Sequence, residues 1–145
     1  MFNFFNKKSK ISKETSVLSK TASLLIHAAK IDQLYTDNER TIIEKTLIEL
    51  GAEKDKLNEI MTIAEQNEKN SNQILDFTKD IKNMDENYKI KIIESLWKII
   101  YSAKNSDIYE SNLMRRLSGL LYLDNKLVGN IKQKIINNLN KLWLI

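Results

Sequence analysis

Three acidic residues in the stretch "AAKIDQLYTDNERTIIEKTL", residues 28–47, are the side chains best placed to do chemistry. Asp32 falls in the last turn of a predicted helix, where the backbone presents about half a negative charge and several unpaired carbonyl oxygens. Asp37 and Glu39 stand at the start of the next predicted helix. Carboxylate and carbonyl oxygens are the ligands that calcium and magnesium prefer. The sequence therefore predicts a weak site for calcium or another divalent cation at Asp32, with Asp37 or Glu39.

A second interpretation of this acidic corner, defined by Asp32, Asp37 and Glu39, requires no metal. Asp32 is then solvated or caps the loop, while the other two acids stabilise the positive end of the following helix. An EF-hand is excluded, because counting from Asp32 puts Asp37 where that loop requires glycine and Ile43 at its twelfth position. Any metal site at this corner is of another kind.

The stretch "IIYSAKNSDIYESNLMRRLS", residues 99–118, repeats the pattern of the acidic corner. A shift of 71 positions lays Glu39 on Glu110 and Ile43 on Met114, but Ala103 stands where the first copy has Asp32. Lys104 then places a cation near a helix C-terminus, which is the charge that a metal would otherwise supply. We therefore expect the second corner to bind no metal.

The residues needed for catalysis are scarce. The chain has no cysteine and a single histidine, His27, so thiolate nucleophiles and cysteine-bound metals are excluded. We expect His27 to be a packed or surface helix residue. No glycine-rich phosphate loop and no nucleophile elbow is present. The sequence therefore predicts that the protein is not an enzyme.

The N-terminal residues 1–14 differ in composition from the rest and are predicted to form a basic, aromatic tail ahead of a domain at residues 15–145. One interpretation is that aromatic and basic side chains contact an anionic membrane surface or a partner protein. The other is a frayed terminus, or phenylalanines that fold back on the domain. The candidate contact residues are Phe2, Phe4, Phe5, Lys7 and Lys8.

The net charge of +4 is concentrated at the N-terminus. Residues 1–20 hold five lysines and one glutamate, so the remaining residues sum to zero. Residues 32–68 are acidic and residues 82–145 are basic. A chain polarised in this way lacks the uniform basic surface of a nucleic-acid-binding protein, and no nucleic-acid partner is predicted.

The chain has no proline and only three glycines, a composition that favours helices throughout. Thr36 and Glu39 form a capping-box pattern, and Gly51 suits the left-handed turn after a helix. Residues 15–31 and 88–103 are apolar on a wide face, so we expect them to be the most buried pair. The predicted fold is a single all-α domain of seven helices, in which two similar helix-loop-helix halves pack around that pair. The expected helices span about 15–31, 37–50, 53–67, 74–81, 85–103, 107–121 and 124–143.

No apolar run approaches the ~18 residues of a membrane span, and the N-terminus lacks the apolar stretch of a signal peptide. We therefore expect a cytoplasmic protein. Peripheral attachment at the inner face of the membrane, through the tail, is the alternative that remains open.

The stretch "SLLIHAAKIDQLYTDNERTIIEKTL", followed by "DFTKDIK" and "IIESLWKIIYSAKNSDIYESNLMRRLSGLL", resembles the TerB-like family associated with bacterial tellurite resistance. The likeness covers roughly residues 15–136. It implies an all-helical domain with an acidic surface proposed to hold divalent metal, and membrane-associated protein partners. The family pattern in each half is Ala-Asp-Gly. The first half keeps only Asp32 of this pattern, and Gln33 replaces the glycine.

The resemblance and the residues together predict a non-catalytic stress-response module. It is expected to bind protein partners, and a divalent cation at the acidic corner. The alternative is a structural or membrane-recruited adaptor without metal, in which the acidic and basic halves contact different proteins. Saturable binding of calcium, magnesium, manganese or zinc that disappears when Asp32 is changed would separate the two.

Overall fold

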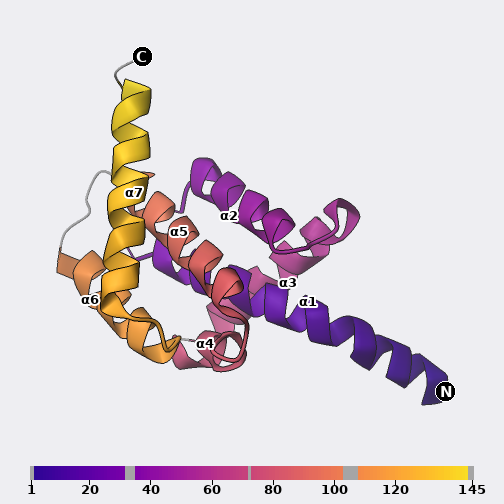
Figure 1. Ribbon diagram of the computed structural model, residues 1–145. Coiled ribbons are helices and arrows are strands. Elements are labelled where there is room, and N and C mark those ends of the chain that lie inside the picture. Colours follow the sequence, from indigo (N-terminus) through magenta and orange to yellow (C-terminus); the bar gives the residue numbers. More distant parts are fainter. Residues whose placement is uncertain (1, 32–34, 72, 103–107, 144–145) are drawn as a thin grey trace.

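The computed structural model describes residues 2–31, 35–71, 73–102 and 108–143, with side chains described for 15–31, 35–71, 73–101 and 112–138. These residues form seven α-helices and one short 3₁₀ helix, η1, with no strand among them. The all-α prediction is therefore confirmed. In chain order (Figure 1) the elements are α1 (Phe2–Ala29), α2 (Asp37–Glu49), η1 (Lys54–Lys56), α3 (Leu57–Asn70), α4 (Leu75–Ile81), α5 (Glu86–Ser102), α6 (Ile108–Leu120) and α7 (Asn125–Trp143).

Helix α1 begins at Phe2, thirteen residues before the start predicted at Thr15. The predicted boundary was wrong because it followed the apolar pattern, which thins before Thr15, whereas the backbone needs only residues that tolerate a helix. No proline or glycine interrupts residues 2–29. The N-terminal part of α1, indigo in Figure 1, projects beyond the other helices. The division into a tail and a domain stays a prediction.

The core is centred on α1 and α5, as predicted. Helix α1 contacts α2, α3, α4 and α5, and α5 also contacts α2 and α7. Among the side chains that the structure describes, seven of the twelve largest that are fully buried come from α1 and α5. A helix that is apolar over so wide a face is stable in water only when several neighbours cover it. These seven side chains are Leu24, Leu25, Ile26, Ile92, Ile93, Leu96 and Ile99.

The two halves of the chain end their second helices in the same way. After α2, the amide of Gly51 donates to the carbonyl of Ile48 at 3.0 Å, and Ala52 donates to Leu47 at 2.9 Å. After α6, the corresponding bonds from Tyr122 and Leu123 to Gly119 and Ser118 measure 3.2 and 2.8 Å. Each pair is displaced by the same 71 positions found in the sequence. At this turn, the internal repeat of the sequence is therefore also a repeat of backbone structure.

The residue in the left-handed position of this turn differs between the halves. Gly51 has a φ of +109°, a conformation that costs glycine little because it lacks a Cβ. Its counterpart Tyr122 has a φ of +57° and is exposed. The ammonium groups of Lys82 and Lys89 lie 6.0 and 5.8 Å from the centre of the Tyr122 ring, within reach of a cation–π contact.

Candidate functional site

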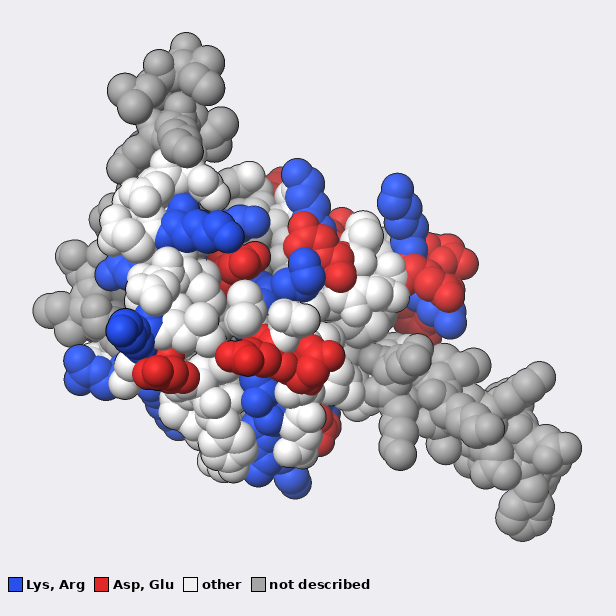
Figure 2. Space-filling model, in the orientation of Figure 1, with Lys and Arg blue, Asp and Glu red and all other residues white. Residues whose placement is uncertain are grey.

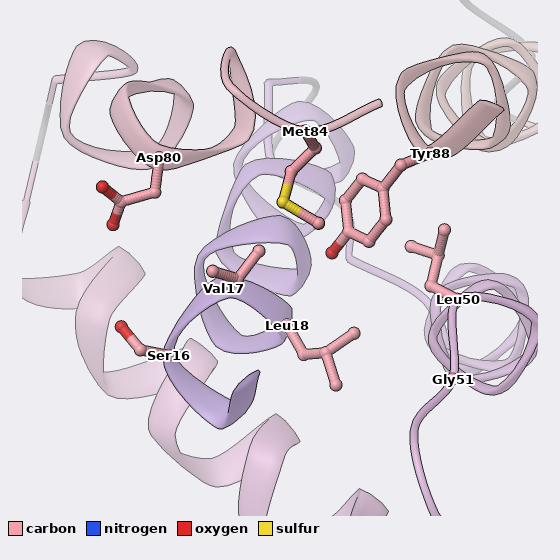
Figure 3. Close-up of a pocket in the computed structure, with 8 residues that line it drawn as sticks. All are labelled: Ser16, Val17, Leu18, Leu50, Gly51, Asp80, Met84 and Tyr88. Atoms are coloured by element: carbon pink, nitrogen blue, oxygen red, sulfur yellow. The ribbon is translucent and has the colours of Figure 1, made fainter. Parts of the chain in front are cut away.

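An open pocket of about 650 Å³, here called the apolar groove, lies between α1, the end of α2 and the turn from α4 to α5 (Figure 3). Figure 3 shows Leu18, Leu50, Met84 and Tyr88 facing a common space, with Ser16 and Asp80 at its other end. The lining residues are Ser16, Val17, Leu18, Leu50, Gly51, Asp80, Met84 and Tyr88.

Local structure explains why these segments leave a groove between them. Helix α2 ends at Glu49, and the chain turns at Gly51 in the left-handed conformation. Helix α5 starts beside Asp85, whose Oδ1 accepts a hydrogen bond of 2.8 Å from the amide of Tyr88. This cap fixes the first turn of α5. The chain reversals at Gly51 and Asp85 thus form two walls of the groove, and α1 forms the third.

The chemistry of the groove is that of a binding surface for apolar groups. Val17, Leu18, Leu50 and Met84 are half-buried, so each keeps part of its apolar surface open to solvent. Leu18 and Leu50 pack partly against the hydrophobic core. Val17 and Met84 do not belong to the set of side chains packed against it. Covering such surface with an apolar side chain removes it from water and is favourable.

Two polar groups of the groove, the Tyr88 hydroxyl and the Asp80 carboxylate, have partners within the protein. The hydroxyls of Tyr88 and Thr21 lie 2.9 Å apart and share a hydrogen bond. Burial raises the pKa of Tyr88 above its usual value of 10.0, although the bond with Thr21 lowers this pKa in part. The phenol is therefore neutral near pH 7. Asp80 forms an ion pair with Lys20.

The acidic corner predicted to hold a cation is only partly described. Asp32 lies outside the described residues. Asp37 is exposed, and Glu39 is 2% exposed. The Glu39 Oε1 accepts hydrogen bonds from the amide and the hydroxyl of Thr36, at 2.9 and 3.1 Å, so Glu39 acts in the predicted capping box.

The described part of the chain contains no group of three His, Cys, Asp or Glu residues that could hold a metal ion. The described residues of the corner alone thus do not fit a divalent cation, because the Glu39 carboxylate is committed to Thr36. The site of Asp32 with Asp37 or Glu39 stays a prediction. Its counterpart with Ala103, Lys104 and Glu110 lies outside the side chains that the structure describes.

Acidic residues of α2 and α3 gather beside the acidic corner and are held by one arginine. Arg40 Nε lies 3.1 Å from Glu44 Oε1, and Arg40 Nη1 lies 3.5 Å from Glu65 Oε1.

The buried hydroxyl of Tyr35 has no hydrogen-bond partner among the described residues. Burial, and next the charge of Glu65, raise the pKa of Tyr35 to about 12.

His27 takes the structural role that was predicted for it. Its Nδ1 lies 3.5 Å from Glu68 Oε1, and its ring packs against Phe77 with centroids 6.1 Å apart. Lys30 Nζ binds the other Glu68 oxygen at 2.8 Å. The imidazole thus joins α1 to α3 and α4.

The candidate tail residues Phe2, Phe4, Phe5, Lys7 and Lys8 belong to α1 by their backbone. Their side chains lie outside those that the structure describes, so membrane or partner contact through them stays a prediction. No helix in the described ranges is both long enough and apolar enough to cross a membrane.

Sequence reasoning did not find the apolar groove. Its walls come from residues 16–18, 50–51 and 80–88, and no local pattern connects segments so far apart. The one signal available in the sequence was Gly51. It predicted the end of a helix, but not that a groove lies beside this helix end.

Comparison with known families identifies a family to which most of the chain is similar. The family model described as "Tellurite resistance protein TerB" matches residues 18–133, which is most of the chain and includes the α1, α2, α4 and α5 segments that line the groove, except for Ser16 and Val17. The match confirms the resemblance found in the sequence. No curated protein and no solved structure matches the chain.

Proposed function

This chain belongs to the TerB family, and we propose that it is a non-catalytic module of a tellurite-type stress response that binds protein partners through the apolar groove. The observation that carries the proposal is the groove itself: about 650 Å³ of open, mostly apolar space between three helical segments. Small domains use such surfaces to hold the apolar face of a partner's helix, with anchoring side chains three or four residues apart.

Two features of the lining support binding rather than catalysis. Tyr88 is neutral and hydrogen-bonded to Thr21, so it is not poised as a base. Asp80 is ion-paired with Lys20. A nucleophile beside an oriented base, which covalent catalysis requires, is not found among the lining residues.

The proposed place of action is the cytoplasm, with membrane-associated proteins among the partners, as the family resemblance implies. A cation at Asp32, Asp37 and Glu39 is not part of the proposal, because Glu39 already accepts two hydrogen bonds from Thr36.

Photo-crosslinking in the native host tests the proposal. A photoreactive phenylalanine at Met84, in the groove, is expected to capture a distinct protein, whereas the same residue at Ile31 is not. Ile31 is a suitable control because it is exposed and apolar and follows the end of α1, whereas the groove lies beside residues 16–18 of that helix.

The captured protein is then purified and its affinity measured. We expect Met84→Lys to weaken binding by at least about tenfold and Ile31→Lys to leave it unchanged. In a strain that lacks the gene, Met84→Lys should restore growth on tellurite less well than Ile31→Lys. Equal affinities for the two variants would refute docking in the groove.

A further inference from the structure

We propose that two copies of this chain form a two-fold dimer, in which the N-terminal part of α1, residues 2–14, of each copy lies in the apolar groove of the other. The proposal rests on the groove being a docking surface, as proposed above: residues 2–14 of the second copy occupy the groove until a partner protein displaces them. It is carried by three observations: the course of α1, the composition of residues 2–14 and the charge around the groove.

The course of α1 prevents residues 2–14 from reaching the groove of their own molecule. The helix is continuous from Phe2 to Ala29, and Ser16, Val17 and Leu18 line the groove. Residues 2–14 therefore leave the bundle at the edge of the groove and project away from it (Figure 1). Folding back would require α1 to break, whereas a second copy can approach without any change in the helix.

Residues 2–14 extend α1 by about 20 Å beyond its packed part. Most helical stability in proteins comes from tertiary packing of an apolar face, which this extension lacks in Figure 1. The segment contains Phe2, Phe4, Phe5 and Ile11. Large aromatic side chains supply much of the energy at protein interfaces, because each buries a large apolar area. Contact with another molecule would stabilise both the helix and its apolar residues.

The groove offers the complementary surface. Its half-buried apolar residues, including Val17 and Met84, keep part of their apolar surface exposed to solvent. The volume of the groove, about 650 Å³, is sufficient for more than one large side chain. Because the groove begins where the projecting part of α1 ends, two antiparallel copies of this part would each reach the groove of the other. Such a contact uses the same two surfaces in both copies and closes after two subunits.

The charges also match. Residues 2–13 hold four lysines and no acid. Residues 47–55, around the Gly51 wall, hold three acids and one lysine, a net charge of −2. Residues 75–88, around the Asp80 and Tyr88 wall, hold four acids and two lysines, again −2, although Lys20 of α1 neutralises one of these acids, Asp80. Figure 2 shows acidic side chains gathered over the turn that follows α2 and near the start of α5. A basic helix is thus drawn to this groove.

An anionic membrane would also attract a basic, aromatic helix. The membrane accounts for the lysines and phenylalanines but leaves the groove unused, and acidic residues beside the groove would be repelled by the membrane surface. The second copy accounts for all of these features.

Sedimentation equilibrium of the full chain tests the proposal. We expect a dimer for the natural chain. The triple variant Phe2→Ser, Phe4→Ser, Phe5→Ser and the groove variant Met84→Lys should each raise the dimer dissociation constant by at least about tenfold. The matched controls are Asn3→Ser with Asn6→Ser, in the same helix segment, and Ile31→Lys. Both controls should remain dimeric, and circular dichroism checks that every variant folds.

Mixing the two defective variants gives a second test that does not depend on either variant alone. The intact N-terminal segment of Met84→Lys can occupy the intact groove of the triple variant, so the mixture should associate more tightly than either component. Failure of the mixture to associate, while the natural chain is a dimer, would overturn the proposal.

Two further outcomes would also overturn it. One is a natural chain that stays monomeric at high micromolar concentration; the proposed function would still stand if Met84→Lys blocked the captured partner. The other is a monomeric chain that floats with phosphatidylglycerol vesicles and loses this attachment in the triple variant, which would assign residues 2–14 to a membrane.

Discussion

The turn at Gly51, which forms one wall of the apolar groove, gives a sharp test of the structure through replacement by alanine. With a φ of +109°, Gly51 has a backbone conformation that residues with a Cβ rarely adopt. A Cβ built there meets no atom within 4 Å, so no steric clash contributes. The predicted change in stability therefore comes from the backbone alone.

We expect Gly51→Ala to lower the free energy of unfolding by about 1–2 kcal/mol, the cost of a left-handed conformation for an L-residue. At about 2–4 °C per kcal/mol for a chain of this size, the midpoint of thermal unfolding should fall by several degrees. The assay is thermal and urea unfolding followed by circular dichroism.

Two other glycines supply matched controls. Gly119 in α6 and Gly129 in α7 have no left-handed φ, and a Cβ at either also meets nothing within 4 Å. Alanine at these positions should raise stability by about 0.5–1 kcal/mol, because glycine is unfavourable inside a helix. Replacement of glycine by alanine is thus expected to lower stability at Gly51 and to raise it at Gly119 and Gly129. If Gly51→Ala were as stable as the two helix variants, the left-handed turn and the wall that it forms would be wrong.

Three further predictions concern other parts of the molecule. Between about pH 10 and pH 12 stability should decline, because the pKa of Tyr35 is raised to about 12 in the folded chain and the unfolded phenol ionises first; Tyr35→Phe should reduce this decline in urea unfolding at alkaline pH. Leu96→Ala should cost about 2–5 kcal/mol in urea unfolding, because Leu96 is fully buried in the core. If a divalent cation binds, a calcium or manganese titration followed by NMR should shift amides around Asp32 and none around Asp107, and Asp32→Asn should abolish the shifts. No shifts at millimolar metal would leave the acidic corner as a helix cap.

The local features of this chain were determined by its sequence. The capping box of Thr36 and Glu39 and the helix end at Gly51 depend on residues within a few positions of one another, so both were predicted and both are present. The wide apolar faces of α1 and α5 required several helices to cover them, whichever part of the chain supplied those helices. This requirement identified the central pair before any packing was known.

The start of α1 shows the limit of the apolar pattern. That pattern reports which face of a helix is covered, not where the helix begins. The apolar pattern did not predict that residues 2–14 are helical, because it weakens before Thr15. These residues contain no proline or glycine that would stop a helix.

Only the tertiary structure decided where the apolar groove lies. Val17, Leu50 and Met84 are ordinary apolar residues in their own segments, and each could equally have been covered by a neighbour. They remain half-buried because α2 turns away at Gly51 and the chain reverses again before Asp85, so two separate chain reversals leave the same stretch of α1 uncovered. Periodicity shows that a side chain prefers to be buried, but the packing of whole helices determines which side chains stay open to a partner.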